Sequence, residues 1–135
     1  MAKESGLGWT TCTVDDASGT GQDIRNDCTN LQFSTPRAVQ EVTGLDKSAI
    51  ERLLLLADFS VTLNGVFNDA ANKSHAVLKT IPSTSVPRTV SLAVSGQTLA
   101  NECLLTDYPL TRADSGELTW AVPGVLADGT VPTWS

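Results

Sequence analysis

Hydrophobic and polar side chains alternate along much of this chain, which is typical of β-strands with one buried face. The clearest segment is 58–67, where Phe59, Val61 and Leu63 fall on one side and polar residues fall on the other. Five further segments alternate in the same way or are rich in β-branched and aromatic residues: 9–14, 27–34, 89–95, 102–112 and 117–122. The pattern predicts a mainly β protein, folded as an antiparallel β-sandwich or partial barrel.

One segment has helical character and is expected to flank the sheet. Residues 70–79 follow Asn68 and Asp69, which are good N-cap residues, and their apolar side chains include Ala70, Val77 and Leu78. Pro82 then ends the pattern. The sequence therefore predicts one flanking α-helix of two to three turns.

Residues 36–56 form a long excursion between strands whose detail the pattern leaves open. Asp46 is a suitable cap for a short helix that would continue through Leu54. Residues 53–56 fit equally well as the start of the next strand, because periodicity cannot assign a continuous apolar run. We expect a long inter-strand loop here and extended terminal arms, the C-terminal arm comprising residues 123–135.

Charge and length restrict the class of protein further. The 135 residues include 15 acidic and 9 basic side chains, a formal net charge of -6. A chain of this length supports one hydrophobic core, so residues 1–135 are expected to form a single domain. The acidic balance argues against wrapping nucleic acid, which requires basic groups. No apolar run approaches the roughly 20 residues of a membrane span, so we expect no membrane insertion and a chain that stays in the cytosol.

The residues with reactive side chains do not form a catalytic set. The only histidine, His75, lies in the predicted helix, where a lone histidine usually packs or is solvated. Three carboxylates flank a predicted hairpin turn, where acids are normally solvated: Asp107, Asp114 and Glu117. The glycine-rich segments 6–8 and 18–21 lack the lysine and spacing of phosphate-binding loops. We expect neither enzymatic activity nor a cofactor.

The cysteines argue against a disulfide-linked or metal-binding fold. Cys12, Cys28 and Cys103 are odd in number and contain no CxxC spacing. Such cysteines in a cytosolic chain are expected to be reduced, half-buried strand residues. We therefore predict neither a disulfide framework nor a metal site.

The outward positions of the predicted strands are mostly serine, threonine and asparagine, with scattered acids. An ordinary solvated sheet face accounts for this composition. A surface that lines a wet passage, built from the strands of several subunits, accounts for it as well. The second interpretation also explains why segments 58–67 and 117–122 carry few of the lysines and prolines that protect free strand edges.

Residues 58–68, preceded by Val42-Thr43-Gly44, resemble the central signature of the tail tube (major tail) proteins of long-tailed bacteriophages. Residues 116–122 and 128–134 are similar to the C-terminal end of that family, and residues 23–27 are similar to its opening. The resemblance extends in order from about residue 8 to residue 134. The three cysteines are a departure, since the family needs none.

The resemblance implies a structural virion protein. Members of the family form six-membered rings that stack into the hollow tail tube, through which the genome leaves the capsid. The implied partners are further copies of the chain, the tape measure, tail terminator and distal tail proteins, and double-stranded DNA in transit. The implied location is the virion tail, after assembly in the host cytoplasm.

The resemblance also assigns roles to residues. It implies that the wall of the lumen is mildly acidic and repels DNA weakly. The implied wall residues are Asp58, Ser60, Thr62, Asn64, Glu117 and Thr119. It implies that the 36–56 loop reaches a neighbouring ring and that the two arms bridge subunits. The contact candidates are Trp9, Val42, Leu45, Ile50, Leu53 and Trp134. For the two tryptophans, the alternative is that they simply close the sandwich.

Two rival interpretations remain from the sequence. The first is another ring-forming protein of this fold class, such as a tail terminator, a connector or the tube of a secretion machine. The second is a monomeric immunoglobulin-like adhesion or decoration module.

Overall fold

The computed structural model describes residues 3–135, which form ten β-strands and one short helix. The elements are β1 (Thr11–Asp15), β2 (Gly21–Asp23), β3 (Cys28–Ser34), β4 (Arg37–Glu41), β5 (Arg52–Ala57), β6 (Ser60–Val66), α1 (Ser74–Leu78), β7 (Arg88–Val94), β8 (Gln97–Leu105), β9 (Leu110–Arg112) and β10 (Leu118–Leu126). The mainly β, antiparallel fold class predicted from the sequence is confirmed.

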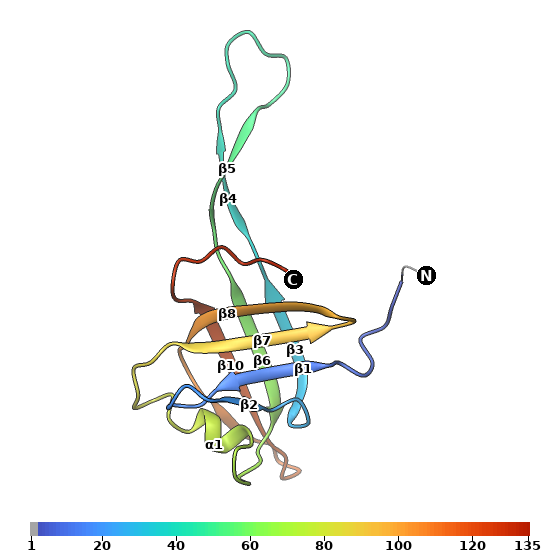
Figure 1. Ribbon diagram of the computed structural model, residues 1–135, viewed down its shortest axis with the longest axis vertical. Coiled ribbons are helices and arrows are strands. Elements are labelled where there is room, and N and C mark those ends of the chain that lie inside the picture. The colour runs from blue at the N-terminus through green and yellow to red at the C-terminus, as the bar shows by residue number, and fades with distance from the viewer. Residues whose placement is uncertain (1–2) are drawn as a thin grey trace.

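Eight strands form one sheet that folds over on itself into two layers. The order is β2-β1-β7-β8-β10-β6-β3, and β9 pairs with the first part of β10. Strands β1, β7 and β8 cross over β3, β6 and β10, with the hydrophobic core between the two layers (Figure 1). The sheet remains an open, partial barrel, because β2 and β3 lie at its two ends.

Each layer supplies the core with alternate side chains, as the sequence pattern predicts. Phe59, Val61 and Leu63 are at most 2% exposed, and so are Trp120 and Val122 on β10. The facing layer contributes a second set of side chains: Cys12, Val14, Val90, Leu92, Leu99 and Cys103. Burying such aliphatic and aromatic side chains stabilises a fold by about 1.5–3 kcal/mol each.

A close approach of backbone and indole links β3, β6 and β10, which form the rear layer in Figure 1. A Cβ on Gly65 of β6 would lie 2.3 Å from the carbonyl oxygen of Asp27 and 2.4 Å from Cζ2 of Trp120, so only glycine fits. The Trp120 Nε1 donates to the Val66 carbonyl at 2.8 Å, and the Val66 amide donates to the Asp27 carbonyl at 2.9 Å. This junction fixes β3, β6 and β10 relative to one another.

The helix is shorter than predicted, a single turn over Ser74–Leu78 rather than residues 70–79. Asn72 adopts a positive φ of 61°, which cannot continue a helix. No side chain of the predicted cap bonds the first helical amide. Instead the buried Asp27 carboxylate accepts from the Ser74 amide at 3.0 Å and from Asn68 Nδ2 at 2.9 Å.

A buried arginine holds the other end of this helical turn to the sheet. Arg88 of β7 is 1% exposed, and its guanidinium donates to the carbonyls of Val77 and Asp15 and to the Thr80 hydroxyl. Burial lowers the pKa of this guanidinium. The bonds to neutral oxygens satisfy the buried donors, which would otherwise be costly to bury.

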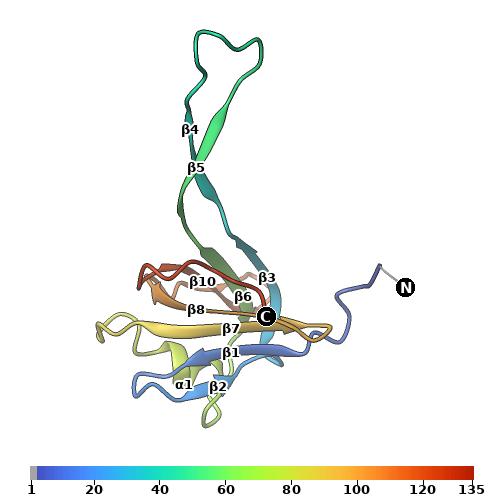
Figure 2. The ribbon, with the colours of Figure 1, turned by 45° about the horizontal axis from the view of Figure 1, so that its top comes forward.

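The long excursion predicted at 36–56 is a two-stranded hairpin with a loop over residues 42–51, and the short helix suggested after Asp46 is wrong. Strands β4 and β5 pair antiparallel and project far from the two layers in both views (Figures 1 and 2). Residues 53–56 belong to β5.

The predicted start of the C-terminal arm at residue 123 is also wrong. Strand β10 continues through Pro123 to Leu126, pairing along its length with β6. Pro123 is tolerated because it lies between the part of β10 that pairs with β9 and the part that pairs with β8, where no ladder partner needs its missing amide. The arm therefore begins at Ala127.

Among residues 3–135, no helix is long and apolar enough to cross a membrane.

Replacing Gly65 with alanine should lower the free energy of unfolding by about 2 kcal/mol or more, because the added Cβ overlaps backbone and a buried indole. Urea denaturation measures the loss. Gly6→Ala is the matched control, since no atom lies within 4 Å of a Cβ at that position. Equal stabilities of the two variants would contradict the tight junction.

Candidate functional site: a polar face and a projecting hairpin

The outward side chains of four strands lie on one surface, which we call the polar face. Residues directly opposite in an antiparallel ladder point to the same side of the sheet. Thr62 is opposite both Gln32 and Pro123, Asn64 is opposite Asn30, and Thr119 is opposite Thr111. The polar residues of this face are Asn30, Gln32, Ser34, Ser60, Thr62, Asn64, Thr111 and Thr119.

Hydroxyl and amide groups dominate the polar face. All of its polar residues except the half-buried Asn64 are exposed, and the Ser34 and Ser60 hydroxyls lie 3.0 Å apart. Val66 and Val125 add partly exposed apolar side chains at the margins. Every outward position of these four strands lies within residues 3–135, and none of them is basic. The face therefore presents many groups that can hydrogen-bond to water, and it presents no cation that could bind phosphate.

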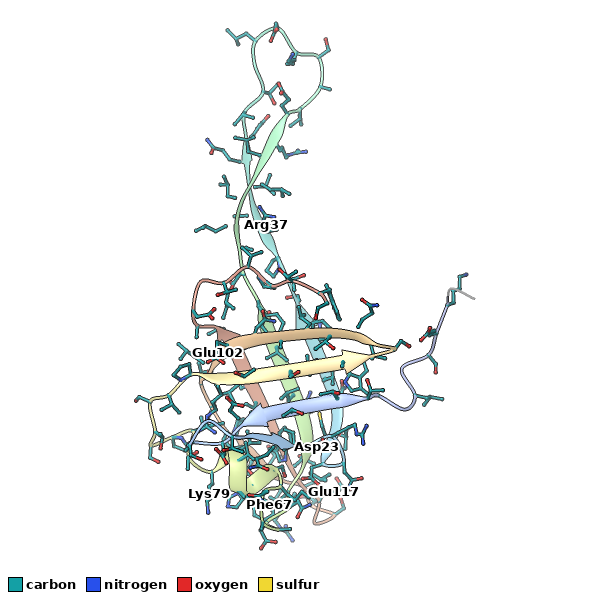
Figure 3. The ribbon with its side chains drawn as sticks, viewed as in Figure 1. Asp23, Arg37, Phe67, Lys79, Glu102 and Glu117 are labelled. Atoms are coloured by element: carbon teal, nitrogen blue, oxygen red, sulfur yellow. The ribbon has the colours of Figure 1, made fainter. Side chains whose placement is uncertain are left out.

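Acids stand only at the two ends of this face. Asp58 precedes β6 at the base of the hairpin, and its carboxylate accepts from the Phe59 amide at 2.8 Å. Glu117 lies in the turn before β10, bonded to the Ser115 hydroxyl, at the end of the molecule remote from Arg37 and the hairpin (Figure 3). The seven residues of β6 between these ends span about 23 Å, well beyond the ~8 Å screening length of physiological salt. The two carboxylates therefore act independently.

The structure brings most of the sequence-predicted wall residues together. Ser60, Thr62, Asn64 and Thr119 share the polar face, whereas Asp58 and Glu117 lie at its opposite ends. Sequence reasoning missed Asn30, Gln32, Ser34 and Thr111. The alternation of residues 27–34 already placed the first three on one side of a strand, but only the pairing register joins that side to Thr62 and Asn64.

The second feature is the hairpin, whose apolar side chains have no core to pack against. Leu45 and Leu56 are 108% and 85% exposed, and other exposed apolar residues surround them: Val39, Val42, Ile50, Leu53, Leu54 and Leu55. Figure 3 shows the side chains of the hairpin extending to both sides, away from the two layers. Exposed apolar surface of this extent usually marks a protein contact site.

Backbone and side-chain bonds keep the hairpin extended. The Val42 amide donates to the Glu51 carbonyl, and the Glu51 amide donates to the Thr43 hydroxyl, each at 2.9 Å. At the base, the Asp58 amide donates to the Pro36 carbonyl and Arg37 Nε donates to the Leu55 carbonyl. Four of the six predicted contact residues lie on this element: Val42, Leu45, Ile50 and Leu53.

The two predicted tryptophan contacts pack against their own chain. Trp9 Nε1 donates to the Thr11 carbonyl, and the Trp134 ring lies 5.9 Å from the Phe33 ring. The adjacent Ser135 exchanges two backbone hydrogen bonds with Thr98 of β8. Trp9 and Trp134 both line an open depression of about 480 Å³. This packing fits the alternative that the tryptophans close the sandwich, and their role between subunits stays a prediction.

His75 also packs rather than standing in a catalytic arrangement. Its ring centre lies 4.6 Å from that of Phe67, and its Nδ1 lies 3.1 Å from the Tyr108 hydroxyl. Burial raises the pKa of Tyr108. Among the described residues 3–135, no group of three or more histidine, cysteine and acidic side chains is placed to hold a metal ion.

Comparison with solved structures shows the class of fold. The chain superposes on a chain from the tail of an empty gene transfer agent particle, determined by helical refinement with C6 symmetry, with a TM-score of 0.71 and 19% identity over 98% of both chains. It superposes equally well on a chain of the virion of a native gene transfer agent particle, with a TM-score of 0.74 and 15% identity over 98% of this chain and 99% of the other.

The likeness is therefore one of fold, over essentially the whole of each chain. No protein-family profile matches the sequence, and no curated protein is similar enough to match it.

The polar face should contribute little to folding. Combined replacement of Ser60 by alanine and of Thr62 and Thr119 by valine should change the free energy of unfolding by less than about 1 kcal/mol, because these side chains point outward. Leu63→Ala, on the inward side of the same strand, should cost about 2–5 kcal/mol. Thermal or urea unfolding of purified protein distinguishes the two. A large loss in the triple variant would assign the face a structural role.

Proposed function

We propose that this chain is the tail tube subunit of a phage-like particle, a structural protein rather than an enzyme. The observation that carries the proposal is the agreement of fold, over 98% of the chain, with chains from the tail and the virion of gene transfer agent particles. The sequence resemblance to tail tube proteins supports the same assignment independently. The subunits form six-membered rings that stack into a tube.

Within a ring, the polar face lines the lumen. Strand β3 ends the sheet, and its residues 28–34 include no proline and no charged residue to protect the free edge. An unprotected edge of this kind is a site for pairing with another chain. Pairing between the edges of adjacent subunits continues the polar face around the ring and removes the free edges.

Between rings, the hairpin is the contact element. Its exposed leucines, isoleucine and valines become buried when it lies against the next ring of the stack. Burial of apolar surface contributes about 25 cal/mol per Å², which favours stacking once many copies act together. The partners that follow from this assignment are the tape measure, tail terminator and distal tail proteins, and the location is the virion tail after assembly in the host cytoplasm.

The polar face suits the passage of double-stranded DNA. Binding to DNA gains its strength from basic groups that neutralise phosphates and release counterions, and the face has none. Its hydroxyl and amide groups keep a layer of water at the wall. Asp58 and Glu117, repeated around each ring, form acidic rims that repel phosphate only at short range. DNA therefore moves through without being held.

Negative-stain electron microscopy of the purified protein tests the proposed function. Long tubes of stacked rings are the expected result. Isolated rings would instead indicate a terminator or connector, and a sharp monomer peak at high concentration without rings would indicate an adhesion or decoration module. Either of these outcomes would reject the tail tube assignment.

Charged substitutions at the hairpin tip should abolish tubes without unfolding the subunit. Leu45→Asp combined with Ile50→Asp places carboxylates where apolar contact is required, and both side chains are exposed in the isolated chain. We expect an unchanged unfolding midpoint and loss of tubes by microscopy. Leu45→Met, which keeps the site apolar, should assemble normally. Normal tubes from the double aspartate variant would exclude the tip from the contact.

Reversing charge at the rims should slow DNA passage. Asp58→Lys or Glu117→Lys adds a cation that binds phosphate, so particles carrying either variant should assemble but eject DNA several-fold more slowly, most strongly at low salt. Asp58→Asn, which removes charge without adding a cation, is the control. Ejection rates equal to those of the control at all salt concentrations would remove the substituted residue from the wall.

A further inference from the structure

Two cysteines from opposite layers of the fold line the same depression. Cys12 lies in β1 and Cys28 begins β3, and these strands are not ladder neighbours. The turn between them is held by Ile24, whose amide donates to the Cys12 carbonyl and whose carbonyl accepts from the Cys28 amide, each at 3.1 Å. These two hydrogen bonds hold the start of β3 beside β1.

The two cysteines lie beside the same opening to solvent. The Cys28 thiol donates to the Asn30 carbonyl at 3.3 Å. Both residues line a depression of about 180 Å³, together with Trp9, Arg25 and Thr29. Cys12 is 1% exposed, whereas Cys28 is only partly buried. A reagent in the depression therefore reaches Cys28 first.

The two sulfurs are chemically unequal. The neighbouring Cys12 side chain lowers the pKa of Cys28 to about 7. The Cys28 side chain and burial raise the pKa of Cys12, and the Asp23 carboxylate adds to that increase. Arg25 is the basic residue of the depression. Thiolate therefore forms at Cys28 near neutral pH, with a protonated thiol beside it.

We propose that Cys12 and Cys28 are a redox pair, reduced in the cytoplasm and closed into an intramolecular disulfide when the protein meets a small-molecule disulfide oxidant. The Cys28 thiolate attacks one sulfur of the oxidant, forms a mixed disulfide and releases one thiolate. Cys12 then loses its proton to solvent and attacks Cys28 Sγ, which expels the second thiol fragment. The protein loses two hydrogens and two electrons, and one oxidant molecule is reduced to two thiols.

Closure would tie the two layers together covalently. Strand β3 lies at the end of the sheet with β6 as its ladder neighbour, and the disulfide would join it to β1 in the other layer. A disulfide across a loop of this size restricts the unfolded chain, and the melting temperature should rise by about 5–10 °C. The proposed pair is a property of the folded subunit and does not depend on assembly into a tube.

Incubation of the native protein with oxidised glutathione tests the pair. The expected product is a monomer lighter by about 2 Da, with one linked peptide containing residues 12 and 28 after digestion, and with the raised melting temperature reversed by dithiothreitol. A stable glutathione adduct on Cys28 of the wild-type protein, an intermolecular dimer or unmodified thiols would each overturn the proposal.

Single variants separate the roles of the two sulfurs. Cys12→Ala should stop the reaction at a glutathione adduct on Cys28, and Cys28→Ala should leave Cys12 unmodified in the folded protein. Cys103→Ala is the control, because Cys103 is buried in the core, where burial raises its pKa to about 12, and this variant should still lose about 2 Da. Closure that fails in Cys103→Ala would place the disulfide elsewhere. The mass of the oxidised wild-type protein decides the question even if a variant does not fold.

Discussion

The rest of the structure depends on the contact between Gly65, Asp27 and Trp120. There the backbone of the loop before β3 passes so close to β6 that no side chain fits between them, and the indole closes over the gap. The Asp27 carboxylate then supplies the acceptor for the first amide of α1 at Ser74. One tight junction therefore orders the rear layer and the helical turn, and a buried carboxylate is tolerated because its hydrogen bonds replace water.

This junction makes the two other features possible. Because the inward side chains of β6 and β10 are committed to the core, their outward positions are free to remain small, polar and uncharged. The hairpin continues β3 and β6 beyond the core, where its exposed leucines do not pack against the core of their own chain. An outward polar face and an apolar element without a partner in its own chain are both consistent with the proposed assembly of many copies.

The net charge of -6 is distributed in a way that matters for the proposed role. The acids near the polar face stand at its ends and not along it, so the middle of this face is neutral. A uniformly acidic wall would repel DNA along the whole path, whereas acidic rims separated by a neutral stretch act only as DNA passes them. The two features favour a passage that neither binds nor strongly repels DNA.

Alternation of side chains by itself determined the fold class, the inward set of Phe59, Val61 and Leu63, and the polar character of the outward set, because these depend on a period of two along each strand. Only the tertiary structure decided which outward sets share a face, since register is a property of paired strands. It also decided the length of α1, whose N-terminal acceptor comes from Asp27, and the hairpin at 36–56, where apolar residues form strands without a core. Those outcomes depend on pairing and contacts between separate segments, so the local pattern left residues 53–56 open between helix and strand and did not set the length of α1.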